Sequence, residues 1–289
     1  GFGTLQQGFY ITSNEGKLIK VINKKNGLKC EIIKACFEDR QKGLWLALDV
    51  GISRIEINSE FQFLNEDDGL EGIVNAAVNF NGKIYCGTTK GLFEIDNQQI
   101  KRYNNFNNDI RNILKINHDG KEWLLLLSEI GTFKLDQENK LNKLNDEDGY
   151  FIVESKFHKN NFFLGTSKGL CIMNLNTNTL IDYYNSPMPE VRRIAEENDS
   201  LIWLGTTHHG VYSIKNVFKQ NYEVQSYDTT KGLPHNTNDL PFSIKDRVLF
   251  GTIQGIYEFN KATQKFIKAN NFASQYYNEN DQIFQIVET

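Results

Sequence analysis

Short apolar runs separated by glycine, asparagine and aspartate follow one another along the whole chain, and one stretch shows the pattern completely. Asn81-Gly82 suits a tight hairpin turn, because both residues tolerate positive φ. The apolar alternation on either side predicts four strands, at residues 73–80, 83–87, 92–96 and 100–103. Helical periodicity is almost absent from the rest of the chain. The pattern therefore predicts an all-β protein made of four-stranded antiparallel units.

One phrase recurs in these units: an apolar pair, Gly-Thr, two or three variable residues, a glycine, and a further apolar alternation. Clean copies begin at Tyr85, Phe163, Trp203 and Phe250, degenerate copies begin at Trp45 and Leu126, and a first copy is read at residues 11–16. The final glycines of the seven copies are Gly16, Gly51, Gly91, Gly131, Gly169, Gly210 and Gly255. They are separated by 35, 40, 40, 38, 41 and 45 residues. Seven repeats of about forty residues predict one seven-bladed β-propeller domain over residues 1–289.

The two ends of the chain indicate how such a ring closes. Residues 281–287 resemble an inner strand, whereas the first repeat has no clear inner strand before residues 9–12. We therefore expect the C-terminal strand to join the first blade, which would remove an open sheet edge. The alternative is that residues 281–289 begin an eighth blade. The chain starts at Gly1 without an initiator methionine, and we interpret it as a mature product or a piece of a longer protein.

The repeat resembles the two-component regulator propeller repeat. The residues that carry the resemblance are Asp39…Gly43-Leu44-Trp45, Asp199…Trp203-Leu204-Gly205-Thr206 and the linker Lys231-Gly232-Leu233-Pro234-His235-Asn236. The resemblance implies a non-catalytic, periplasmic or otherwise extracytoplasmic sensor part of a hybrid two-component histidine kinase, with the kinase elsewhere in a longer parent. In that family, two seven-bladed propellers precede a β-sandwich and a membrane helix. A second propeller or a homodimer partner is therefore an expected contact.

Composition and charge narrow the partners. Hydrophobic residues make up 39% of the chain, enough for a sizeable core. The 36 acidic and 32 basic side chains give a net charge of -4, and no run of Lys or Arg occurs. We therefore expect no nucleic-acid partner and no membrane contact by this segment. The four cysteines form no disulfide framework, and Cys86 and Cys171 lie in apolar runs, which favours free thiols.

Common catalytic motifs are missing from the sequence. It has no phosphate-binding loop, no Gly-x-Ser-x-Gly, no His-Glu-x-x-His and no Cys-x-x-Cys. The acidic segments 66–69 and 146–149 lack the glutamate that ends an EF-hand loop, and we interpret them as turns. We accordingly expect no catalytic residue, no metal site and no cofactor.

Ligand-binding candidates come from two kinds of loop that open on the same face of a propeller. One is the turn of the repeated phrase, and the other leads into the next inner strand. The candidates are His208, His209, His235, Arg192, Arg193, Lys90 and Lys168. Imidazole, guanidinium and ammonium donors suit a polar or anionic ligand, for which an oligosaccharide is the leading expectation. Because neighbouring residues of a strand point to opposite sides, we expect at most one of Arg192 and Arg193 to face a given groove.

Other conspicuous side chains are given structural roles. His118 and His158 are expected in solvated turns, and Trp45, Trp123 and Trp203 in packing between blades.

Two alternative functions remain open at this point. The first is a lyase or hydrolase like the streptogramin lyase propellers, which would need His208, His209 or His235 beside an acid and a metal. The Trp-Leu-Gly-Thr form of the repeat departs from that family. The second is a structural scaffold whose faces bind other proteins.

Overall fold

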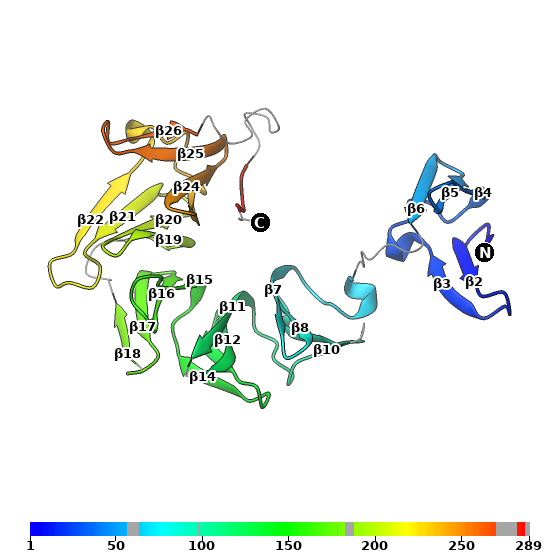
Figure 1. The fold of residues 1–289 in the computed structure, drawn as a ribbon, viewed down its shortest axis with the longest axis horizontal. Coiled ribbons are helices and arrows are strands. Elements are labelled where there is room, and N and C mark those ends of the chain that lie inside the picture. The colour runs from blue at the N-terminus through cyan, green and yellow to red at the C-terminus, as the bar shows by residue number, and fades with distance from the viewer. Residues whose placement is uncertain are drawn as a thin grey trace. The chain divides into compact units, whose positions relative to one another are not determined.

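The computed structural model of the chain describes residues 1–56, 64–96, 99–118, 120–177, 179–182, 188–269 and 282–286. These residues form β-strands and three short 3₁₀ helices, with no α-helix among them. The strands make seven antiparallel sheets, five with four strands and two with three (Figure 1). The chain divides into two compact units, Gly1–Glu71 and Gly72–Thr289, which are described separately.

The N-terminal unit contains the two three-stranded sheets. The first is formed by β1 (Phe2–Gly3), β2 (Phe9–Thr12) and β3 (Leu18–Ile22), and the second by β4 (Ile33–Glu38), β5 (Gly43–Leu48) and β6 (Ile52–Glu56). The 3₁₀ helices η1 (Lys24–Asn26) and η2 (Glu66–Asp68) follow them. Both helices lead into a left-handed glycine and a buried leucine. The core of this unit lies between the two sheets, around Phe9, Ile33 and Leu46.

The C-terminal unit contains five four-stranded sheets. In chain order these are β7 (Val74–Phe80), β8 (Lys83–Thr88), β9 (Gly91–Asp96) and β10 (Gln99–Arg102); β11 (Ile110–His118), β12 (Lys121–Ser128), β13 (Gly131–Leu135) and β14 (Leu141–Asn145); β15 (Gly149–Glu154), β16 (Asn161–Thr166), β17 (Gly169–Asn174) and β18 (Thr179–Asp182); β19 (Arg193–Asn198), β20 (Leu201–Gly205), β21 (Val211–Lys215) and β22 (Glu223–Tyr227); and β23 (Leu240–Ile244), β24 (Arg247–Thr252), β25 (Gly255–Asn260) and β26 (Lys265–Lys268). A third 3₁₀ helix, η3 (Thr229–Lys231), precedes β23. The four strands predicted over residues 73–103 are confirmed to within one residue at each end. The predicted hairpin is confirmed too, since Asn81 and Gly82 have φ of 52° and 74°.

The five sheets of this unit follow one another around a curve. The first strands β7, β11, β15 and β19 lie on its inside, and the last strands β14, β18 and β22 lie on its outside (Figure 1). Successive first strands are neighbours in space. The core therefore lies between consecutive sheets, as where Phe163 and Leu170 of one sheet pack against Ile202 and Leu204 of the next.

Turn chemistry explains the recurring Gly-Thr phrase. The Thr166 hydroxyl donates a hydrogen bond to the Gly169 carbonyl at 3.1 Å and accepts one from the Lys168 N–H at 3.2 Å. This pair of hydrogen bonds forms a clasp across the turn, and its first bond is buried while its second is partly buried. The same clasp recurs at Thr88, Ser128, Thr206 and Thr252. The closing glycine cannot carry a side chain, because a Cβ on Gly91, at φ +129°, would lie 1.9 Å from the Phe106 carbonyl oxygen.

The first copy of the phrase was assigned wrongly to Gly16. The Thr4 hydroxyl donates to the Gly8 carbonyl at 2.9 Å, just as Thr206 donates to Gly210 at 2.8 Å. A Cβ on Gly8 would lie 2.1 Å from the carbonyl oxygen of Ile22, the last residue of β3. A Cβ on Gly210 would lie 2.2 Å from the carbonyl oxygen of Tyr227, the last residue of β22. Gly16, in contrast, lies in the β2–β3 hairpin with nothing near it. The first copy is therefore Gly3-Thr4…Gly8, and β1, β2 and β3 correspond to the second, third and fourth strands of the other sheets.

The C-terminal segment occupies a defined place against the last sheet. Residues 282–286 are described and form no regular strand, while residues 281 and 287 of the predicted strand lie outside the described residues. The Ile283 N–H donates to the Thr252 carbonyl at 3.0 Å, as the Val191 N–H donates to the Thr166 carbonyl at 2.9 Å. Ile283 also packs against Gly251 as Val191 packs against Gly165. The segment thus begins where an inner strand begins, and its pairing with the first sheet stays a prediction.

Candidate functional site

The C-terminal unit holds a cavity of about 490 Å³ at the beginning of its inner strands. Side chains from the five inner strands or the loops that precede them line it, among them Asn75, Arg111, Tyr150, Arg192 and Arg193, and Phe284 of the C-terminal segment also lines it. The sheets deliver these side chains from residues far apart in the sequence. Most of the lining residues are polar or charged, with the rings of Tyr150, Phe151 and Phe284 among them, so the cavity suits a polar ligand.

A β-bulge repeated in the same place turns these side chains toward the cavity. In β7, β11 and β15 the register with the neighbouring strand shifts at one point, which leaves Asn75, Arg111 and Tyr150 as the extra residues. A bulge bends its strand and re-aims a side chain that regular alternation would place elsewhere. The bulge therefore gives each of these three sheets one equivalent position, which is occupied by Asn75, Arg111 or Tyr150.

Arg111 is held by acidic and aromatic neighbours and keeps one donor unused. Its Nε donates to Asp109 Oδ2 at 3.1 Å, and its guanidinium lies 4.4 Å from the centre of the Tyr150 ring. Its Nη1 lies 3.9 Å from Asp148 Oδ2, too far for a hydrogen bond. This buried nitrogen has no hydrogen-bond partner among the described residues.

Arg192 and Arg193 both line the cavity. Arg192 Nε donates to the Thr207 hydroxyl at 2.8 Å, and its guanidinium lies 3.6 Å from the Tyr150 ring centre. Arg193 donates through one terminal nitrogen to Gln285 Oε1 at 2.9 Å. The prediction that only one arginine faces a given groove was wrong, because Arg192 precedes the first residue of β19 and strand alternation does not reach it.

Arg193 lies in apolar surroundings. Its guanidinium is 4.1 Å from the ring centre of Phe242 and 4.9 Å from that of Phe151. Burial lowers its pKa to about 10, so the group stays charged at neutral pH. Its Nε has no hydrogen-bond partner within the described part of the chain. Arg193 was selected from sequence as a ligand-binding candidate, but the sequence could not show its burial.

The acidic groups near the cavity do not balance the arginines. Asp109 is the acid that lines it, and its carboxylate accepts from Arg111 and from the Asn75 amide. Asp239 lies between two lining residues, Asn238 and Leu240, and is completely buried. Neither of its oxygens has a hydrogen-bond partner among the described residues, and burial raises its pKa to about 8. Asp239 is therefore neutral at pH 7, and the cavity carries an excess of positive charge.

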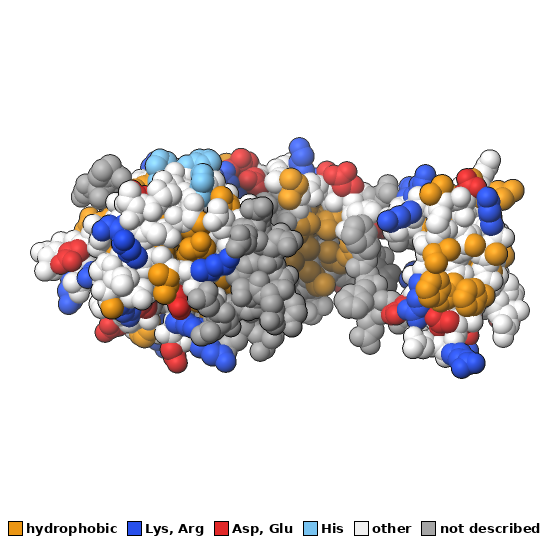
Figure 2. All heavy atoms as spheres, turned by 90° about the horizontal axis from the view of Figure 1, so that it is seen from above, with side chains coloured by type: hydrophobic (Ala, Val, Ile, Leu, Met, Phe, Trp, Pro, Cys, Tyr) orange, Lys and Arg blue, Asp and Glu red, His pale blue; other side chains and the backbone are white. Residues whose placement is uncertain are grey.

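The predicted histidines lie beside the cavity, not in it. His208, His209 and His235 are exposed, and none of them is a lining residue. Their loops are joined by two backbone hydrogen bonds, Gly210 N–H to Asn236 and Asn238 N–H to Thr207, each 3.0 Å long. Figure 2 shows histidine side chains gathered on one surface of the C-terminal unit. His209 Nδ1 lies 4.0 Å from Glu190, and His235 Nδ1 lies 2.8 Å from the Thr237 hydroxyl.

The two predicted lysines also project outward. Lys90 is exposed, and its carbonyl accepts a hydrogen bond from Arg102. Lys168 is exposed, and its ammonium lies 3.7 Å from Glu147. Neither is among the lining residues. The expectation for His118 was wrong, since this histidine is only 8% exposed and packs against Trp123.

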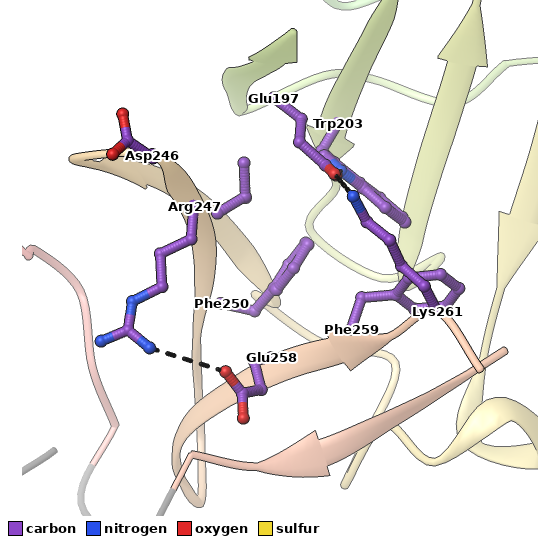
Figure 3. A pocket seen from close by; sticks show the side chains of 9 residues that line it. Glu197, Trp203, Asp246, Arg247, Phe250, Glu258, Phe259 and Lys261 are labelled. Atoms are coloured by element: carbon purple, nitrogen blue, oxygen red, sulfur yellow. Dashed lines mark hydrogen bonds and ion pairs between the residues drawn. The ribbon is translucent and has the colours of Figure 1, made fainter. Parts of the chain in front are cut away.

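A smaller pocket between β20 and the last sheet has most of its charged groups in ion pairs (Figure 3). Glu197 accepts the Trp203 indole N–H at 2.7 Å and forms an ion pair with Lys261, and Arg247 lies 3.9 Å from Glu258. The Trp203 ring is 1% exposed and packs on Tyr227, Phe250, Phe259 and Phe266. The predicted packing role of Trp203 is confirmed, and this pocket is a product of that packing.

The described residues show neither a metal cluster nor a membrane-spanning helix. They contain no group of three or more His, Cys, Asp or Glu side chains placed to hold a metal ion. No helix among them has the length and apolar character needed to cross a membrane. All four cysteines are free thiols, and Cys86 and Cys171 are buried as predicted.

Comparison with known sequences gives one informative relative. No protein-family model matches the chain. Over 109 residues it is 31% identical to histidine kinase P4 of Formosa agariphila. The match covers 36% of this chain and 8% of the length of that relative.

Solved structures resemble the chain at low sequence identity. The extracellular domain of a hybrid two-component system from B. thetaiotaomicron aligns with 92% of this chain and 44% of its own, at 16% identity and a TM-score of 0.35. The WD40 β-propeller domain of Doa1 aligns over 81% of both chains, with 13% identity and a TM-score of 0.50. An ancestral GH74 enzyme aligns with 82% of this chain and 38% of its own, with 15% identity and a TM-score of 0.51.

These likenesses agree with the sequence pattern. The two structures at or above a TM-score of 0.5 show an all-β fold of the propeller type and nothing about activity. Over 109 residues the chain is similar in sequence to a histidine kinase, in agreement with its resemblance to the two-component regulator propeller repeat.

Proposed function

We propose that this chain is a non-catalytic sensor domain of an extracytoplasmic two-component signalling protein and that it binds a small ligand in the arginine-lined cavity. The observation that carries the proposal is the cavity itself, where guanidinium and amide groups from successive sheets converge beside aromatic rings. The similarity to a histidine kinase supports the signalling context. A kinase belongs to the longer parent protein in this proposal, because the chain matches 8% of that relative's length.

The proposed architecture is a closed seven-bladed ring. The first sheet has the second, third and fourth strands of the repeat and lacks the inner one. Residues 282–286 begin as an inner strand does, and the described residues of their own unit provide no second strand for them. By the register of β19 with β20, in which Arg193 faces Gly205 and Ile194 faces Leu204, Gln285 would pair with Gly3 and Ile286 with Phe2.

Exposed apolar residues in the N-terminal unit support closure. Phe2, Phe37 and Ile52 are 52%, 62% and 70% exposed, and Figure 2 shows hydrophobic side chains at the surface of this unit. Apolar surface of this extent in a soluble domain usually has a partner. In the proposed ring, neighbouring blades cover it.

Signalling would follow from differential binding. A ligand can shift an equilibrium between two arrangements of a protein only if it binds one more tightly than the other. Because the cavity is lined from five successive sheets, a ligand within it would favour one spacing of their inner strands. A second propeller or a homodimer partner would read that spacing, and the kinase would respond to it.

The enzyme alternative rests on one observation. His209 and Glu190 approach to 4.0 Å, which is the imidazole–acid part of what this alternative requires, while the described residues contain no group placed to hold the metal that it also requires. Incubation of the chain with glycosides and esters, compared with a His209→Ala variant, tests it. Turnover that the variant loses would replace the sensor proposal.

A thermal-shift screen tests the sensor proposal. The panel contains neutral, carboxylated and sulfated mono- and oligosaccharides, and the variant Arg192→Gln reports whether binding occurs in the cavity. A ligand at a hundred times its dissociation constant adds about 2.7 kcal/mol to the stability of the folded state. We expect a rise in Tm that the variant loses. No shift with any ligand, together with self-association or binding of a second propeller in sedimentation, would favour the protein-binding scaffold.

A further inference from the structure

The proposed function leaves the class of ligand open, and the geometry points to a ligand that carries an oxyanion, a carboxylate or a sulfate, held by the guanidinium groups of Arg192 and Arg193. This inference rests on the proposed function and specifies it. It arises from unused donors, from missing counter-charges and from the position of one buried acid.

Unused donors are present on two of the three arginines. Nη1 of Arg111 and Nε of Arg193 are buried and have no hydrogen-bond partner among the described residues. A buried donor without a partner is costly, and folded proteins leave few of them. Both belong to side chains that line the cavity, although the two nitrogens themselves lie below its surface, so a ligand would reach them only through a shift of the guanidinium groups.

Counter-charges are also missing. Arg192 contacts a hydroxyl and the Tyr150 ring, and Arg193 contacts an amide oxygen and two phenyl rings. No carboxylate within the described residues pairs with either guanidinium. A planar guanidinium binds a carboxylate or sulfate through two parallel hydrogen bonds, and such charge-assisted bonds are stronger than those to a neutral hydroxyl.

Because Arg193 is buried, the lack of a negatively charged partner costs more free energy there than it would at an exposed arginine. The phenyl rings of Phe151 and Phe242 exclude water from this guanidinium, and burial lowers its pKa to about 10. A charge removed from water is stabilised most by an opposite charge in hydrogen-bonding contact. An oxyanion would supply that charge, whereas a neutral sugar hydroxyl would not.

The acids around the cavity leave room for an anion. Asp109 is neutralised by Arg111 and the Asn75 amide, and Asp148 accepts from the Ser167 hydroxyl at 2.8 Å. Asp239, which is fully buried beside the lining residues, keeps its proton up to about pH 8. Arg111 is paired with Asp109 and Asp148, so Arg192 and Arg193 are the two lining guanidinium groups that have no carboxylate partner among the described residues.

Calorimetric titration of the folded chain with matched probes tests the inference. The probes are D-glucuronate against D-glucose for the carboxylate, D-glucose 6-sulfate for the sulfate, and inorganic sulfate for the anion without a sugar. We expect at least one anionic sugar to bind at least tenfold more tightly than D-glucose, with an affinity that falls as salt rises. The preference between glucuronate and the 6-sulfate identifies which oxyanion the site takes.

Three variants locate the binding. Arg192→Gln changes an exposed side chain and should weaken the anionic probe at least tenfold, while Arg192→Lys should recover only part of the affinity. Arg247→Gln, which removes an arginine from the separate pocket of Figure 3, is the matched control and should bind as the original chain does.

Two results would overturn the inference. One is equal binding of D-glucose and D-glucuronate that Arg192→Gln abolishes, which would keep the sensor proposal and remove the oxyanion. The other is no binding of any anionic probe at millimolar concentration, or anion binding that Arg192→Gln leaves intact.

Discussion

The Ile283 N–H donates to the Thr252 carbonyl at 3.0 Å, the hydrogen bond that joins the start of an inner strand to the preceding sheet. The equivalent bond joins Val191 to Thr166 within the C-terminal unit and Ile33 to Thr4 within the N-terminal unit. Three copies of one contact show that residues 282–286 follow the rule of the repeat. Their backbone therefore starts as an inner strand starts, and β1–β3 is a sheet that lacks an inner strand.

The corrected position of the first repeat predicts different costs for two glycines with the same backbone conformation. Gly8 and Gly16 have φ of 81° and 82°, so alanine would be strained equally at both. A Cβ on Gly8 would also lie 2.1 Å from the Ile22 carbonyl oxygen, whereas Gly16 has open space around it. We expect Gly8→Ala to lower Tm by several degrees more than Gly16→Ala in thermal unfolding followed by circular dichroism. Equal losses of Tm in the two variants would favour the original assignment, in which Gly16 is the final glycine of the first repeat.

A second prediction concerns Leu127 and Gly149. In the sheets that carry a clean copy of the repeat, a glycine of the second strand faces an apolar residue near the start of the next inner strand, as Gly87 faces Ile110. Between β12 and β15 the arrangement is reversed: the large residue, Leu127, is on the second strand, and the glycine, Gly149, begins the next inner strand. A Cβ on Gly149 would lie 2.3 Å from Leu127 Cδ2. Gly149→Val should destabilise the fold by about 2 kcal/mol in urea unfolding, through overpacking.

The double variant tests whether the two positions compensate. Leu127→Gly alone removes a buried side chain and should also destabilise, by roughly 2–5 kcal/mol. Leu127→Gly with Gly149→Val should lose at least 1 kcal/mol less than the sum of the single changes, because each change makes room for the other. Strict additivity would mean that the exchange of sizes has no energetic basis.

Asp239 predicts a stability that falls as pH rises. The unfolded chain releases this proton near the ordinary pKa of 3.8, while burial in the folded state holds the proton until about pH 8. The unfolded state therefore binds fewer protons between these values, and the free energy of unfolding decreases through that range. Asp239→Asn should raise Tm relative to the original chain, with a gain that is larger at pH 8 than at pH 5. The exposed Asp246→Asn is the control, and a gain independent of pH would contradict the burial argument.

The repeat was readable from sequence because its signal is local. Asn81-Gly82 and the Gly-Thr turns depend on backbone conformation within a few residues, and the structure confirms them. The first repeat was assigned wrongly because only Gly1 and Phe2 precede its Gly-Thr, so the apolar pair that precedes Gly-Thr in the clean copies is incomplete here. The spacing to Gly51, 43 residues from Gly8 instead of 35 from Gly16, was the available clue.

The site was only partly readable. Arg192 and Arg193 were selected from a loop beside a strand, but Arg111 and Tyr150 were missed because each is a single residue in a strand of ordinary composition. Their shared position appears only when the bulges of β11 and β15 are aligned. The histidines were selected because they stand out in sequence, and none of them lines the cavity, although Thr207 and Asn238 of the same loops do.

The most direct test of the account is a disulfide across the proposed closure. Phe2→Cys and Ile286→Cys are introduced with Cys30 and Cys36 replaced by serine, since Cys86 and Cys171 are buried. Facing residues of paired strands lie within disulfide range, so mild oxidation should form an internal crosslink that mass spectrometry assigns to these two positions. Leu5→Cys with Ile286→Cys should not crosslink. A closed ring predicts the first result, and crosslinks only between molecules, or equal yields from both pairs, would contradict it.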